Sequence, residues 1–114
     1  NFINNNKPDF IIDAAAKVGG IQSNISNPID YFNSNIQMGL NLLNSSKKNG
    51  IEKLINIGSS CMYPKNINRP ISEKDLLSGH LEPTNEAYAL SKLSIAKYCE
   101  YLSMNNLNYK TINI

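Results

Sequence analysis

Two short apolar runs, separated by a segment of helical character, most constrain how this chain can fold. Residues 10–16 (FIIDAAA) and 53–58 (KLINIG) have the length and composition of strands buried in a parallel sheet. Between them, Asn27-Pro28 is typical of a helix start, and Asn49-Gly50 of a helix end. Apolar residues follow at helical spacing between these points: Ile29, Phe32, Ile36, Leu40 and Leu43. We therefore expect a strand, a helix over 28–49 and a second strand.

The second half of the chain repeats this alternation after a long irregular segment. Residues 64–83 show no sustained periodicity and predict a surface loop, with one turn of helix near 73–77. A helix is expected from residue 84 or 85 to about residue 104, and a third strand over 109–114. The order β-α-β-loop-α-β predicts parallel strands with right-handed crossovers, which is part of a doubly wound α/β sheet.

Composition and charge exclude several classes of partner. The net charge of +2 gives no reason to expect nucleic acid or an anionic membrane as a partner. No apolar run approaches the ~20 residues of a membrane span, and the first residues do not form a signal peptide. Cys61, Cys99 and His80 do not have the spacing of a zinc site, so no metal is expected. We expect a cytoplasmic protein with free thiols.

Tyr88 and Lys92 form the first candidate for chemistry. Four residues apart on a helix, they lie on one face, a turn apart. A free phenol, with a pKa of about 10, transfers protons poorly at neutral pH, and a neighbouring ammonium stabilises the phenolate. The pair is therefore a workable acid-base device, although the same spacing also occurs by chance on ordinary helix surfaces.

Ser59, Ser60 and Cys61 form the second candidate, at the end of the second predicted strand. Ligands of open α/β sheets bind at the carboxyl ends of strands, where a hydroxyl can stabilise a developing oxyanion and a thiolate can act as a base. The simpler alternatives are serines that satisfy their own backbone and a small buried cysteine. Cys99 is expected to be buried in the core, and His80 to be solvated in the loop.

Three strings occur in a familiar order: residues 14–21 (AAAKVGGI), 58–65 (GSSCMYPK) and 81–92 (LEPTNEAYALSK). Together they resemble the GDP-L-fucose synthase family, a branch of the extended short-chain dehydrogenase/reductases. The resemblance covers nearly the whole chain and implies a Rossmann-like fold with NADP(H) as cofactor. It also implies a GDP-sugar substrate, GDP-4-keto-6-deoxymannose, which is epimerised at C3 and C5 and reduced at C4 to GDP-L-fucose. A homodimer of the full-length protein through helices 28–49 and 85–104 is a further implication.

The resemblance also implies a role for each matching residue. Tyr88 corresponds to the tyrosine that protonates the C4 oxygen as hydride arrives, and Lys92 to the lysine that supports it and holds the nicotinamide ribose. Ser59 corresponds to the catalytic serine, and Cys61 to the base that removes protons next to the ketone. The remaining implied positions are Ala15, Ala16 and Lys17 beside the cofactor, Val18, Gly19 and Ser60 beside the substrate, and Asn35 as a structural asparagine.

The same resemblance places some of the machinery outside these 114 residues. The glycine-rich phosphate loop is expected upstream, and the histidine acid and most of the GDP-binding domain downstream, so the chain is expected to be a partial NAD(P)-binding domain that is inactive alone. Other readings remain open. They are a related nucleotide-sugar enzyme (a GDP-heptose epimerase/reductase, a 4-epimerase or a dehydratase), a non-catalytic binding subunit, and a truncated gene product. Ser60 and Cys61, in place of an acidic neighbour, favour epimerisation and reduction over dehydration.

Overall fold

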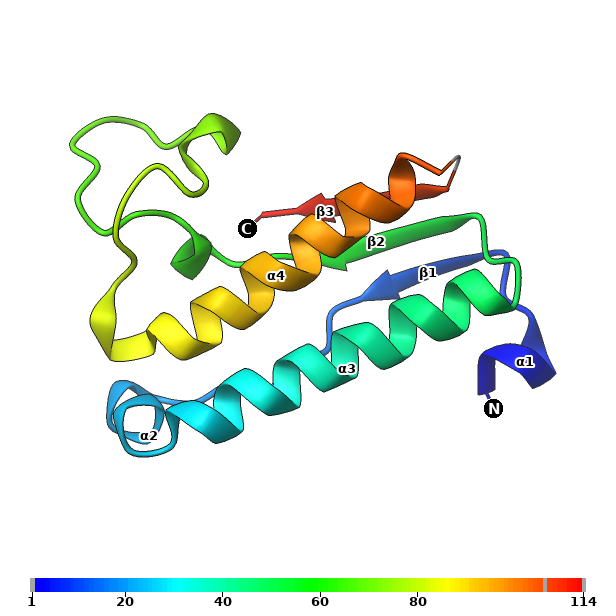
Figure 1. The fold of residues 1–114 in the computed structure, drawn as a ribbon, viewed down its shortest axis with the longest axis horizontal. Helices are drawn as coiled ribbons and strands as arrows, with labels where there is room; N and C mark the ends of the chain where they lie inside the picture. Colours follow the sequence, from blue (N-terminus) through cyan, green and yellow to red (C-terminus); the bar gives the residue numbers. More distant parts are fainter. Residues whose placement is uncertain (1, 106, 114) are drawn as a thin grey trace.

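The computed structural model describes residues 2–105 and 107–113 and confirms the predicted order of strands and long helices (Figure 1). The last predicted strand ran to residue 114, which lies outside the described residues. Two short helices, α1 and α2, were not predicted. The elements are α1 (Phe2–Asn6), β1 (Phe10–Asp13), α2 (Ile21–Ser26), α3 (Pro28–Lys48), β2 (Lys53–Ile57), the 3-10 turns η1 (Ser60–Met62), η2 (Glu73–Asp75) and η3 (Pro83–Asn85), α4 (Glu86–Ser103) and β3 (Asn108–Ile112).

The sheet is parallel, with strand order β1-β2-β3. Helix α3 connects β1 to β2, helix α4 connects β2 to β3, and the two helices pack side by side on one face of the sheet (Figure 1). Sequential parallel strands with both crossover helices on one face are one half of a doubly wound fold. The predicted α/β class is therefore confirmed.

The helix-facing side of the sheet carries the core. Leu54 of β2 and Tyr109 of β3 are buried there, and the Tyr109 hydroxyl donates a hydrogen bond to the Ile51 carbonyl (2.7 Å). The largest cluster of buried residues joins the sheet to both helices: Leu43, Leu54, Ile95, Cys99, Leu102 and Tyr109. Burial of this apolar surface fixes the helices against the sheet.

The prediction of a fully buried first strand over 10–16 is wrong in two respects. The strand ends at Asp13, because the Ala15 N–H turns away from the sheet and donates to the Asp13 carboxylate (3.1 Å). Phe10 and Ile12 are exposed, Ile12 at 57%, since they point to the face that lies opposite the helices and that no described segment covers.

The predicted apolar face of α3 is also only partly correct. Of its five residues, Leu43 alone is buried, Ile36 and Leu40 are half-buried, and Ile29 is 74% exposed. The buried stripe instead consists of Tyr31, Asn35, Gly39, Leu43 and Ser46. Gly39 fits in this stripe because α4 approaches closely there, and Asn35 because it finds hydrogen-bond partners in the loop after β1.

The long surface loop is confirmed over residues 64–82, and the predicted helical turn corresponds to η2. Both terminal guanidinium nitrogens of Arg69 donate to the Asp75 carboxylate, at 2.5 and 2.9 Å, and the Ser72 N–H donates to the same carboxylate at 2.8 Å. The hydrogen bonds from Arg69 are the main reason why the pKa of Asp75 lies well below its usual range. This pairing gives the loop a defined shape without a core of its own.

Substitution of Gly39 tests the close approach of the two helices. A Cβ atom at Gly39 would lie 2.6 Å from the Ile95 side chain, so Gly39→Val is expected to lower the free energy of unfolding by about 2 kcal/mol through overpacking. Urea denaturation followed by circular dichroism measures this. Gly20→Ala is the matched control, because open space surrounds a Cβ there and the backbone φ is −68°. Equal stability of the two variants would contradict the packing argument.

Candidate active site

The ends of β1 and β2 bring two of the predicted motifs to one edge of the sheet. The strands are parallel and pair Asp13 with Asn56, so the segments that follow them leave the sheet side by side. A small cavity of about 10 Å³ lies beneath this edge. Its lining includes Ala15 after β1 and Lys92 of α4, two residues that are far apart in the sequence. The structure therefore places part of the first motif beside part of the third.

The second motif turns sharply out of β2. Gly58 packs against the Asn113 side chain so closely that a Cβ would clash with it, which explains the glycine at this exit. The Ser59 hydroxyl oxygen accepts the Cys61 N–H (3.3 Å) and caps η1. Such a hydroxyl still has its own proton to donate. Ser59 thus satisfies the local backbone, as the simpler alternative proposed, and can also donate to a ligand, while Ser60 is exposed beside it.

Cys61 is held against the start of α4. Its sulfur accepts a hydrogen bond from the Asn85 side-chain amide at 3.1 Å, and Asn85 lies three residues before Tyr88. Cys61 is half-buried. This contact joins the second motif to the third. Asn85 was absent from the predicted site residues, although it lies inside the 81–92 string.

Cys99 has a different environment, as predicted. It is 1% exposed in the core, and burial raises the pKa of its thiol to about 11. Both cysteines are free, so Cys61 is the accessible thiol of the two.

Tyr88 and Lys92 lie one turn apart on α4, as predicted, in different surroundings. Tyr88 is half-buried, whereas Lys92 is 6% exposed and lines the small cavity with Asp13 and Asn56. Desolvation lowers the pKa of Lys92, and the charge of the nearby Asp13 carboxylate acts in the opposite direction. Asp13 therefore helps to keep the lysine in its ammonium form, and the sequence analysis did not identify this role.

The loop after β1 is clamped by α3. The Asn35 side chain accepts the Lys17 N–H (2.8 Å) and donates to the Lys17 carbonyl (3.0 Å) and to the Tyr31 carbonyl (2.8 Å). This agrees with a structural role for Asn35. The Lys17 ammonium pairs with Asp30 at 2.5 Å, so its interaction is with α3.

The rest of this loop faces outward. Val18 and Gly19 are exposed, and Gly19 lies so close to the Tyr31 hydroxyl that a Cβ would clash. Helix α2 follows and packs against η3, which brings the loop near the start of α4. The three predicted motifs therefore surround one edge of the sheet.

Two further findings concern the described parts of the chain. Over residues 2–105 and 107–113, no group of three His, Cys, Asp or Glu side chains has the arrangement of a metal site. In the same ranges, no helix has the length and apolar character required to cross a membrane.

Replacement of Asn35 tests the clamp. Asn35→Ala removes three hydrogen bonds and leaves the Lys17 N–H and carbonyl without their partner on α3, so we expect a loss of about 2 kcal/mol in the free energy of unfolding. Hydrogen exchange should also show faster exchange of the Lys17 amide. Asn41→Ala, on the exposed side of the same helix, is the control. Unchanged exchange at Lys17 would contradict the clamp.

Replacement of Asp13 tests its effect on Lys92. Asp13→Asn keeps the size of the side chain but removes its charge, so the pKa of Lys92 should fall further below its ordinary value. A lysine whose pKa is lower in the folded state destabilises the fold while it is protonated, and this cost disappears as pH rises through the folded pKa. The variant should therefore be less stable at about pH 7, by about 1–3 kcal/mol, and the difference should narrow toward about pH 10. Denaturation of Asp13→Asn and of the exposed control Asp9→Asn at both pH values measures this, and a difference independent of pH would contradict it.

Comparison with known proteins extends these observations. GDP-L-colitose synthase of Yersinia pseudotuberculosis is 50% identical over 112 residues, which cover 96% of this chain and 36% of that protein. GDP-L-fucose synthase of Azorhizobium caulinodans is 46% identical over 112 residues, covering 97% of this chain and 36% of that protein. The structure of MlghC, a GDP-mannoheptose C4 reductase from Campylobacter jejuni with NADP bound, superposes with a TM-score of 0.92 at 27% identity, over 98% of this chain and 36% of that one.

The chain thus spans about a third of the length of these relatives, at 36% in each case. The NAD dependent epimerase/dehydratase family matches residues 1–114. With its motifs gathered at the edge of a parallel sheet, the chain belongs to this family.

Proposed function

We propose that the chain forms the catalytic part of the NADP(H)-binding domain of a GDP-sugar epimerase/reductase that produces GDP-L-fucose. The observation that carries this proposal is the contact between Cys61 on η1 and Asn85 at the start of α4, the helix that carries Tyr88 and Lys92. One sheet edge thereby holds a thiol, a hydroxyl, a phenol and an ammonium. We propose the complete reaction for a full-length protein, because the chain spans only 36% of the length of these two relatives.

The relatives support a GDP-sugar substrate. The names of two of them describe enzymes that make GDP-L-fucose and GDP-L-colitose, and a third acts on a GDP-mannoheptose. GDP-L-colitose is the second candidate product, because the colitose synthase is 50% identical to this chain. Incubation of the full-length protein with GDP-4-keto-6-deoxymannose and NADPH tests the first candidate, because mass spectrometry should then detect GDP-L-fucose. No conversion of this substrate would favour the second candidate.

The residues after β1 fit a dinucleotide cofactor. Ala14 and Ala15 are exposed at the strand end and have no atoms beyond Cβ, so a flat ligand can approach the backbone closely. Lys92 lies beside Ala15 and can donate to ribose hydroxyls. We assign cofactor contact to Ala15, Ala16, Tyr88 and Lys92, and a backbone contact to Lys17, whose ammonium pairs with Asp30. The bound cofactor would supply a hydride to C4 of the sugar.

Reduction then depends on three side chains of this chain. The Tyr88 hydroxyl donates its proton to the C4 oxygen as negative charge develops there, and the Lys92 ammonium stabilises the resulting phenolate. The Ser59 hydroxyl, whose oxygen already accepts the Cys61 N–H, donates to the same C4 oxygen. Burial of Lys92 strengthens its effect on the phenolate, because screening by water is reduced.

Epimerisation depends on Cys61. Its thiolate removes a proton from the carbon next to the ketone, the electrons move onto the C4 oxygen, and Ser59 and Tyr88 stabilise the enolate. The removed proton stays on the Cys61 sulfur, and a different proton is delivered to the opposite face of the carbon by an acid outside this chain. His80, the one histidine of the sequence, is exposed in the loop and does not serve this purpose. Val18, Gly19 and Ser60 are assigned to contact the hexose, since all three are exposed at this edge.

We further propose a homodimer in the cytoplasm. Exposed apolar side chains on the outer faces of α3 and α4 suit association with a second copy. These residues are Ile29, Phe32, Met38, Leu90 and Tyr101. Size-exclusion chromatography of the full-length protein with and without a Phe32→Glu substitution tests the dimer.

Substitution of Tyr88 tests the reductive role. Tyr88→Phe in the full-length protein should lower the rate of C4 reduction at least ~100-fold, because the proton donor is lost, and should retain some deuterium incorporation next to the ketone in D₂O, because Ser59 still stabilises the enolate. NADPH absorbance measures the first quantity and mass spectrometry the second. Tyr101→Phe, at an exposed position of the same helix, should change neither. A normal reduction rate in Tyr88→Phe would exclude this role.

A further inference from the structure

Asn85 interacts with the Cys61 sulfur in a way that local structure does not require. Its side-chain amide nitrogen lies 3.1 Å from the sulfur, across 24 positions of sequence. A hydrogen bond donated to a sulfur favours the charged thiolate over the neutral thiol. The contact therefore joins a donor at the start of α4 to the thiol that follows β2.

The rest of the Asn85 side chain argues against a purely structural role. Asn85 is the residue before α4, the usual position of a capping side chain, but it makes no side-chain capping bond. The cap of the preceding turn comes from Glu82, which accepts from the Thr84 N–H (3.3 Å) and the Thr84 hydroxyl (3.2 Å). Asn85 thus leaves the capping of this region to another residue.

The carboxamide oxygen of Asn85 makes no hydrogen bond within the described part of the chain that would explain the side chain. It is buried and has no hydrogen-bond partner among the described residues. A buried amide oxygen without a donor destabilises a fold by about 1–3 kcal/mol. A side chain that caps nothing and carries this cost is explained by the one bond that it makes, the bond to sulfur.

We propose that Asn85 is a positioning residue that stabilises the Cys61 thiolate and fixes the direction of its sulfur. The proposed effect on the thiol is argued from this contact, whereas its catalytic consequence rests on the proposed function of Cys61 as the epimerisation base. The backbone supports the same geometry from the other side, because the Cys61 N–H is held by Ser59 (3.3 Å). The sulfur is therefore fixed between the end of β2 and the start of α4.

The rate of alkylation by iodoacetamide rises with the fraction of thiolate, and the chain provides an internal reference. Cys99 is buried, with a pKa of about 11, so the fast-reacting thiol is Cys61 and peptide mass spectrometry separates the two. Asn85→Ala should slow alkylation of Cys61 about 10-fold, because a hydrogen bond to a charged group is lost. Asn85→Asp keeps the shape and places a carboxylate beside the sulfur, so it should slow the reaction at least as much. Asn66→Ala, an exposed loop asparagine, is the control and should react at the normal rate.

The Asn85→Asp variant separates an effect on the thiolate from easier access of iodoacetamide to the Cys61 sulfur, because aspartate has the same shape as asparagine. If Asn85→Asp unfolds at the same denaturant concentration as the unsubstituted chain and alkylates at the same rate or faster, the inference is wrong. In the full-length protein, Asn85→Ala should slow deuterium incorporation next to the ketone about 10-fold and leave reduction of an already epimerised substrate unchanged. If the unsubstituted protein incorporates no deuterium, the proposed base role fails, and the alkylation rates still decide whether Asn85 stabilises the thiolate.

Discussion

The parallel register of the three strands is the constraint on which the rest of this structure depends. It aligns Asp13, Asn56 and Thr111 in one row across the sheet, just before the strands end. Asp13 and Asn56 of this row are buried, and the Asn56 amide donates to the Thr111 hydroxyl (3.1 Å). Because Lys92 of α4 shares a cavity with Asp13 and Asn56, the sheet determines the electrostatic surroundings of a candidate catalytic lysine. A shift of one residue in the register would turn this polar row toward the other face.

The two long helices combine stability with the geometry of the site. Gly39 lets α4 approach α3, and one turn earlier on α3 Asn35 holds the loop that follows β1. Ile95, which contacts Gly39, lies one turn after Lys92 on α4. The packing that stabilises the helix pair therefore also sets the depth at which Lys92 is buried. Repacking of the contact between Gly39 and Ile95 would therefore change both the stability of the fold and the burial of the Lys92 ammonium.

The sequence was sufficient for the order of elements and for the motifs, since both depend on local patterns. Asn27-Pro28 marked the start of α3, and the strand ends located Ser59 and Cys61. Burial was harder to predict, because it depends on neighbours in space. Ile29 has the right spacing for a core position and is nevertheless exposed, whereas Gly39 is buried. The short helices α1 and α2 carry too few turns for a periodic signal.

The two pairings within the site, Asp13 with Lys92 and Asn85 with Cys61, could not be predicted from the sequence, because they also depend on neighbours in space. Asp13 has the position of a strand residue, and nothing local indicates that its charge faces Lys92. Asn85 has the position of a helix cap, and only the path of the chain after β2 brings the Cys61 sulfur to it. In both cases a polar residue at the end of an element acts on a residue of another element. A motif can therefore identify the reacting groups, while the residues that tune them are found at the places where elements meet.

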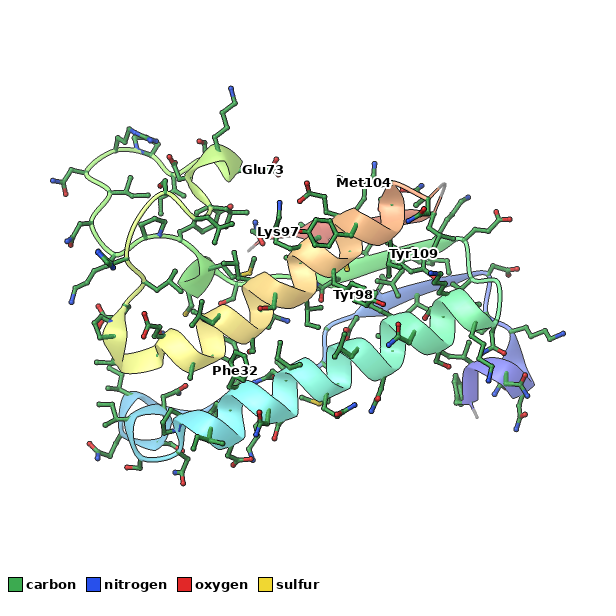
Figure 2. The ribbon with its side chains drawn as sticks, viewed as in Figure 1. Phe32, Glu73, Lys97, Tyr98, Met104 and Tyr109 are labelled. Carbon is green, nitrogen blue, oxygen red and sulfur yellow. The ribbon has the colours of Figure 1, made fainter. Side chains whose placement is uncertain are left out.

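The surfaces on either side of the site follow from the same architecture. One face of the sheet carries both helices, and the other exposes Phe10, Ile12 and Ile112. A second opening, of about 810 Å³, lies along the outer edge of β3, where Glu73 of the loop and Lys97 of α4 contribute to its lining (Figure 2). Doubly wound folds carry helices on both faces of the sheet, and apolar surface of this extent is covered in stable proteins. The polar row lies on the covered face, under α4. The charge effect of Asp13 on Lys92 and the contact of Asn85 with Cys61 therefore arise within this chain, whatever covers the remaining surfaces.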